Sequence, residues 1–120
     1  MTHHTAEHRD DAMSQCIDHC TECHAICLET LAHGLSMGGD HAAPDHIALL
    51  SACADICRTS ADTMLRGTDV HVFTCQACAE ICRRCAEDCE RFGDDPAMQR
   101  CARMCRACAD SCAAMAKHEH

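Results

Sequence analysis

The sequence predicts an all-α protein, an antiparallel up-down-up-down four-helix bundle with a cysteine-lined core, in a single domain over residues 1–120. Cysteines account for 15 of the 120 residues and recur at steps of three and four, the spacing that keeps side chains on one helix face. Leu, Ile, Val and Phe together also number only 15, and Trp and Tyr are absent. The thiols themselves must therefore supply most of the core.

Glycine and proline divide the chain into four segments of similar length. The first two segments are expected to form two antiparallel helices. The first helix is expected over about 10–33, because Gly34 follows the periodic segment and glycine commonly ends a helix. A glycine-containing loop then leads to Pro44, a residue favoured in the first turn of a helix. The second helix is expected over about 44–66, with Gly67 beyond it.

The other two segments begin with polar residues that can cap a helix. Thr68 is expected to cap a third helix over about 69–92. Asp95 and Pro96 combine a capping side chain with a first-turn proline, and they predict a fourth helix over about 95–117. Short connections between helices of equal length favour antiparallel neighbours.

Each predicted helix carries its cysteines as one narrow stripe. At 100° per residue, each set stays within an arc of roughly 60–80°, which is typical of the inward seam of a bundle. The four stripes are Cys16, Cys20, Cys23 and Cys27; Cys53 and Cys57; Cys75, Cys78, Cys82, Cys85 and Cys89; and Cys101, Cys105, Cys108 and Cys112.

Aligning the stripes, with alternate helices running in opposite directions, places the cysteines in layers of 3, 4, 4, 3 and 1 along the axis. Neighbouring layers are about 5 Å apart at a rise of 1.5 Å per residue, so the stripes predict a tube of thiols roughly 20 Å long. Only two layers are complete quartets: Cys20, Cys57, Cys78 and Cys108; and Cys23, Cys53, Cys82 and Cys105.

The two ends of the predicted tube differ in their side chains. At one end, the stripes continue into Met13, Met64, His71 and Met115. A methionine at helical spacing is usually core filler, but thioether and imidazole groups together suggest that a metal ion enters here. The other end is interpreted as an apolar plug made of Leu31, Leu35, Leu50, Phe92 and Met98.

Charge and hydropathy exclude several functions. A net charge of -9 argues against binding to nucleic acid, which requires clustered Lys and Arg. The apolar segments are shorter than the roughly 20 residues of a membrane span, and the first residues lack the apolar segment of a secretory signal. We therefore expect a cytoplasmic protein with reduced thiols, for which a cysteine-rich sequence points to metal or redox chemistry.

The thiols indicate a soft cation as the bound species. Fifteen thiolates would add -15 to the existing -9, so the tube must hold either protons or cations. Thiolates and thioethers favour Cu(I), with zinc and iron–sulfur clusters as competitors. The favoured prediction is several Cu(I) ions per chain. A zinc-binding or thiol redox-buffering bundle is the alternative, and an enzyme is not expected because no carboxylate lies on the inward faces.

These stripes resemble the bacterial four-helix-bundle copper storage proteins, and the lack of an export signal is similar to their cytosolic branch. The resemblance covers residues 13–115 and implies a homotetramer of bundles, each loading many Cu(I) ions through one end for storage or detoxification. It also implies exchange of copper with a chaperone or efflux partner. The chain departs from the pattern on its second helix, where Leu50 and Ser60 occupy stripe positions.

Overall fold

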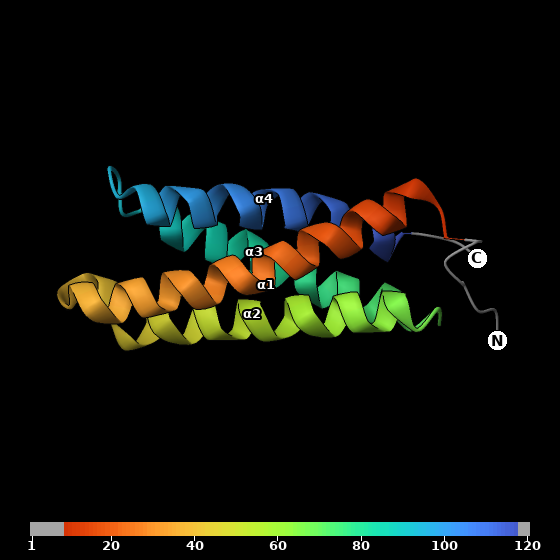
Figure 1. Cartoon of the computed structure of the whole chain (residues 1–120), viewed down its shortest axis with the longest axis horizontal. Coiled ribbons are helices and arrows are strands. Elements are labelled where there is room, and N and C mark those ends of the chain that lie inside the picture. The colour runs from red at the N-terminus through yellow and green to blue at the C-terminus, as the bar shows by residue number, and fades with distance from the viewer. Residues whose placement is uncertain (1–8, 118–120) are drawn as a thin grey trace.

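A computed structural model of the chain describes residues 9–117 and consists, over that range, of four α-helices and one short 3-10 helix (Figure 1). In chain order, the elements are α1 (Asp11–Met37), η1 (Gly39–Ala42), α2 (Pro44–Leu65), α3 (His71–Glu90) and α4 (Pro96–Ala116). The predicted all-α fold class is confirmed.

The helices pack in a square, each against its two neighbours along the chain, with α4 closing against α1. The α1–α2 and α3–α4 connections lie together at one end of the bundle, and the α2–α3 connection lies at the other (Figure 1). We call the first the loop end, made of residues 38–43 and 91–95. The second is the methionine end, where Met13, Met64 and Met115 lie near the helix termini. This arrangement is the predicted up-down-up-down topology.

Helix α1 continues one turn beyond the predicted stop at Gly34. The helix ends at Met37, and Gly38 closes it with a positive φ of 73° and a backbone N–H that donates to the carbonyl oxygen of Gly34. Gly34 serves a different purpose, because a Cβ at this position would lie 2.5 Å from the carbonyl oxygen of His41. The glycine therefore permits close approach of the following loop rather than helix termination.

Helix α3 is shorter at both ends than the predicted range of 69–92. It begins at His71, its N-cap Val70 makes no side-chain capping bond, and the hydroxyl of Thr68 is buried without a hydrogen-bond partner. Thr68 is therefore not the cap that the sequence suggested. The residues before and after the helix form turns, with Phe73 N–H donating to the Val70 carbonyl over 3.0 Å.

The predicted cap of the fourth helix is confirmed, and α1 has a cap that the sequence analysis did not name. The Asp10 side chain accepts a hydrogen bond from the Met13 N–H at 2.7 Å at the start of α1. The Asp95 side chain accepts from the N–H groups of Ala97 and Met98, directly before Pro96. These caps satisfy N–H groups that have no partner within the helix, so they fix where α1 and α4 begin.

All fifteen cysteines are fully buried, with no exposed side-chain surface. The rest of the core is made mostly of small or thioether side chains such as Ala54, Ala86 and Met98. Ile17 and Ile26, which lie between the cysteines of α1 and are also buried, keep slightly more of their surface exposed than the cysteines do.

Within residues 9–117, no helix is long and apolar enough to cross a membrane.

Candidate metal centre

The thiols lie close to one another along the bundle axis. All fifteen are free, and contacting sulfur atoms on different helices are 3.5–3.9 Å apart, as between Cys20 and Cys112 on neighbouring helices or Cys53 and Cys105 on diagonal ones. Sulfur atoms held 2.3 Å from one tetrahedral metal ion would be about 3.8 Å apart. The spacing of the sulfur atoms is therefore close to that of a metal–thiolate site.

At least five quartets of cysteines have all four sulfur atoms within 4.8 Å of one another. When these five are ordered along the axis, each shares two cysteines with the next, so they form a continuous chain rather than separate sites. In that order, they are Cys20, Cys78, Cys108 and Cys112; Cys57, Cys78, Cys82 and Cys108; Cys23, Cys53, Cys57 and Cys82; Cys23, Cys27, Cys53 and Cys105; and Cys27, Cys85, Cys101 and Cys105.

These quartets cross the boundaries between the flat layers that the sequence predicted. Sulfur atoms one helical turn apart lie close together, 3.7 Å for Cys78 and Cys82 and 4.0 Å for Cys101 and Cys105. Helical side chains lean along the axis toward the preceding turn, which brings such pairs together. The expectation of only two four-cysteine groups was therefore wrong, and the number of quartets does not by itself exclude zinc.

Hydrogen bonds among the thiols and burial both affect the proton affinity of the tube. The hydrogen bonds raise the pKa of some thiols, such as Cys57 and Cys105, and lower the pKa of others, such as Cys23 and Cys78. Burial raises the pKa of all four. Protons on buried thiols avoid a stack of negative charges, and cations must displace these protons when they bind.

The residues proposed for metal entry lie together at the methionine end and are all buried. Met13, Met64 and Met115 are exposed by 4% or less, and His71 is fully buried. The imidazole Nδ1–H of His71 donates to the Thr68 carbonyl oxygen at 2.9 Å. The three thioethers and the imidazole are therefore part of the core at this end of the bundle.

Ser60, which replaces a cysteine in the α2 stripe, lies near this end. Its hydroxyl donates to the carbonyl oxygen of Thr74 on α3 at 3.0 Å, and the side chain is fully buried. A hydroxyl is a poor ligand for a soft ion. This stripe position therefore joins two helices rather than extending the row of sulfur atoms.

The apolar plug that the sequence suggested at the loop end is correct except for Leu35. Leu50 and Met98 are fully buried, and Leu31 and Phe92 pack against the core. Leu35 is 57% exposed, because α1 continues past Gly34. The α2 stripe ends there in a buried imidazole, His46, which is 1% exposed. The Nδ1–H of His46 donates to the Asp88 carboxylate of α3 at 2.5 Å, while its Nε2 is buried without a hydrogen-bond partner.

Asp88 is held from two sides. Burial raises the pKa of this carboxyl group, but hydrogen bonds from His46 and Arg91 outweigh burial and hold the pKa below its usual range. Arg91 donates to the other carboxylate oxygen at 2.6 Å. His46 continues the spacing of Leu50, Cys53 and Cys57 along α2. The sequence analysis missed the pair of His46 and Asp88, because the two residues are 42 positions apart and on different helices.

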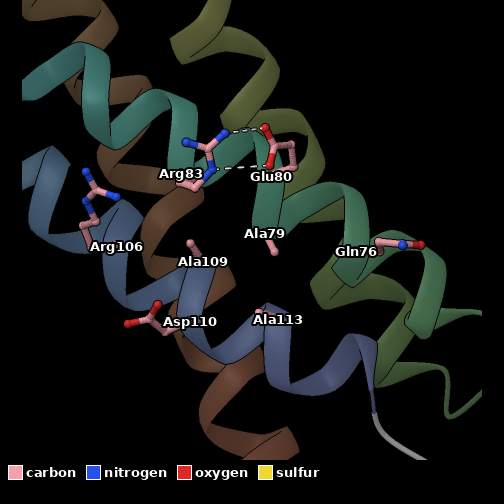
Figure 2. A pocket seen from close by; sticks show the side chains of 8 residues that line it. All are labelled: Gln76, Ala79, Glu80, Arg83, Arg106, Ala109, Asp110 and Ala113. Carbon is pink, nitrogen blue, oxygen red and sulfur yellow. Dashed lines mark hydrogen bonds and ion pairs between the residues drawn. The ribbon is translucent and has the colours of Figure 1, made fainter.

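The surface of the bundle carries a separate hollow between α3 and α4 (Figure 2). Its volume is about 520 Å³, and alanines such as Ala79 and Ala109 form its floor. Glu80 and Arg83 form an ion pair at its edge with a nitrogen–oxygen distance of 2.6 Å (Figure 2). Since no cysteine lines it, this groove is distinct from the sulfur tube.

Comparison with known proteins agrees with the geometry of the tube. A family model described as copper storage protein matches residues 9–117, which is most of the chain. The chain belongs to the copper storage protein family. No curated protein sequence matches it.

Three solved structures show how closely this copper storage family member follows known bundles. A protein from Nitrosospira multiformis is 40% identical, with a TM-score of 0.86, over 92% of this chain and 100% of that one. The Cu(I)-bound copper storage protein 3 of Bacillus subtilis is 30% identical, with a TM-score of 0.81, over 88% and 99% of the two chains. A cytosolic copper storage protein from Streptomyces lividans, described with five coppers, is 29% identical, with a TM-score of 0.82, over 92% and 96%.

Proposed function

We propose that this chain stores and sequesters multiple Cu(I) ions in the cytoplasm, with the thiolates of all fifteen cysteines as ligands. The observation that carries the proposal is the chain of overlapping quartets, in which each shares two cysteines with the next. Shared sulfurs suit a soft ion that accepts few ligands and tolerates bridging thiolates. The ligand set is the one expected from the sequence, namely Cys16, Cys20, Cys23, Cys27, Cys53, Cys57, Cys75, Cys78, Cys82, Cys85, Cys89, Cys101, Cys105, Cys108 and Cys112.

Charge supports a monovalent ion. Replacing one proton by one Cu(I) at each thiol leaves the net charge of the tube unchanged, so the tube can fill without building up buried charge. Because a stack of buried thiolates without cations would be costly, filling at neutral pH should release protons as copper binds.

Zinc is the competing ion, and the overlap of the quartets limits it. A tetrahedral zinc site uses four thiolates exclusively, and fifteen cysteines provide at most three such sites. At least three thiols would then hold no zinc. Each zinc with four thiolates also keeps a charge of -2, which burial makes costly.

An anaerobic titration separates these functions. Cu(I) is added from a competing chelator, and bound copper and released protons are measured on the same sample. We expect saturation on the order of one ion per thiol. Saturation at about three ions, or a preference for Zn²⁺ over Cu(I), would indicate a zinc protein. Thiols that oxidise reversibly without holding either ion would indicate a redox buffer.

We also propose the domain organisation, assembly and partners that the sequence analysis predicted. The whole chain would act as one domain, without catalytic activity, and assemble as a homotetramer that exchanges copper with a chaperone or efflux protein. The family match and the relatives described as copper storage proteins support storage as the role. Met13, Met64, His71 and Met115 would form the entry, a proposal supported by the burial of three thioethers and an imidazole at this end.

A further inference from the structure

A second group of metal-ligating side chains lies at the loop end, outside the sulfur tube. His33 of α1, His41 of η1 and Asp95, the N-cap of α4, converge there. The Nε2 atoms of both imidazoles lie 2.8 Å from the same oxygen, Oδ2 of Asp95. Two consecutive elements, α1 and η1, thus place two nitrogen donors beside one oxygen donor from Asp95, which is more than 50 residues further along the chain.

The surrounding contacts hold these three groups in place. The other carboxylate oxygen of Asp95, Oδ1, accepts hydrogen bonds from the N–H groups that begin α4, which leaves Oδ2 to the imidazoles. The ring of His41 packs against Phe92, with ring centroids 4.5 Å apart. The three side chains keep 31%, 22% and 13% of their surface exposed, so the cluster is ordered and still reachable from solvent.

We propose that His33, His41 and Asp95 form a binding site for one divalent cation of the zinc class, separate from the thiolate store. Imidazole nitrogen and carboxylate oxygen suit Zn²⁺, Ni²⁺ or Co²⁺. Cu(I) prefers the thiolates of the tube. The chain would therefore carry two metal sites of different chemistry: the thiolates of the tube for soft ions, and the imidazoles and carboxylate of the loop end for divalent ions such as Zn²⁺.

The observed distances are close to those of a bound ion. Ligand atoms about 2.0–2.1 Å from a tetrahedral zinc ion lie roughly 3.3 Å apart. Each Nε2 atom lies 2.8 Å from Oδ2 of Asp95, so it would need to move away from this oxygen by only about half an ångström. In the metal-free state each Nε2–H donates to Asp95. When the ion binds, each neutral ring carries its proton on Nδ1 instead, and the Nε2 lone pair faces the metal. Water completes the coordination.

The charge of the carboxylate favours such a site. The hydrogen bond from His33 is the main cause that holds the pKa of Asp95 well below its usual range, and the bond from His41 adds to it against the effect of burial. The ligand is thus ionised in neutral solution. A bound cation would tie the last turn of α1 and the η1 loop to the start of α4, and would stabilise the loop end.

The test follows each imidazole nitrogen directly. Zn²⁺ is added to the full chain, both metal-free and after Cu(I) loading, and long-range ¹H–¹⁵N correlation spectra report which histidine nitrogens bind metal. We expect the Nε2 signals of His33 and His41 to change from protonated to metal-bound in both samples. The metal-free sample makes the test independent of copper storage. Unchanged Nε2 signals for these two residues would overturn the proposal.

Matched variants give the affinity at the site. Asp95→Asn keeps a good helix cap but removes the charged ligand, and it should weaken Zn²⁺ binding to the Cu(I)-loaded chain at least tenfold. His33→Gln with His41→Gln should abolish that binding. His19→Gln is the control, because His19 is a half-buried histidine bonded only to Ser111 at 2.6 Å. Equal affinity in all variants would place the ion elsewhere and contradict the assignment.

Discussion

The two ends of the bundle differ in chemistry although the same four stripes lead to both. At the methionine end the stripes finish in buried thioethers and a buried histidine. At the loop end they finish in His46, bonded to Asp88, and in a loop held to α4 through Asp95. The loop end is thus held by hydrogen bonds between polar side chains, whereas the methionine end offers the soft donors that the proposed entry of copper requires.

The largest expected effect is on the rate of copper transfer at the methionine end. Changing Met13, Met64 and Met115 together to Leu keeps the volume but removes the soft sulfur ligands. Loading and removal of Cu(I) should slow at least tenfold in stopped-flow transfer from a chelator, while the final capacity stays the same. Met98→Leu, at the loop end, is the control and should leave the rates unchanged. Equal rates for both variants would remove the distinction between the ends.

The next effect is on stability at the loop end. Asp88→Ala leaves the Nδ1–H of His46 buried without an acceptor, which should lower the free energy of unfolding by about 1–3 kcal/mol. Urea denaturation of the metal-free chain measures it. Ser60→Ala is the comparison at the other end, because it removes a hydroxyl donor and leaves only the Thr74 carbonyl without that bond. A larger loss from Ser60→Ala would show that the methionine end is the more firmly bonded one.

A smaller loss of stability is expected from Gly34→Ala. The added Cβ would lie 2.5 Å from the His41 carbonyl oxygen, and the loop must shift, at a cost of about 1–2 kcal/mol. Moving His41 should also weaken Zn²⁺ binding at the loop end. Cu(I) capacity, measured by the chelator titration, should be unaffected. An unchanged free energy of unfolding would show that the loop containing His41 can shift at little cost.

The smallest effect is a change of one ion in capacity. Ser60→Cys restores a thiol to the α2 stripe near the methionine end and should add about one Cu(I) per chain at saturation. Leu50→Cys makes the matching change toward the loop end. We expect Ser60→Cys to fill as quickly as the native sites and Leu50→Cys to fill last, as followed by copper content during stepwise loading. The reverse order would place the entry at the loop end.

The sequence by itself determined the helices, the stripes and the chemical class of the site. Periodic cysteines at steps of three and four can share a face only on a helix, and caps such as Asp95 depend on neighbours within four residues. Because these interactions are local, the all-α class and the sulfur core were predicted correctly. The metal class followed from the thiols, since softness is a property of the ligand atom and does not depend on the fold.

Only the tertiary structure decided how the sulfur atoms group and what closes the loop end. The quartets depend on the tilt of each side chain and the stagger of facing helices, which spacing along one chain does not contain. Gly34 was interpreted as a helix stop, yet its role comes from contact with His41 in a later loop. The partners of His46 and His33 lie 42 and 62 residues away, so only packing of the four helices could bring them together.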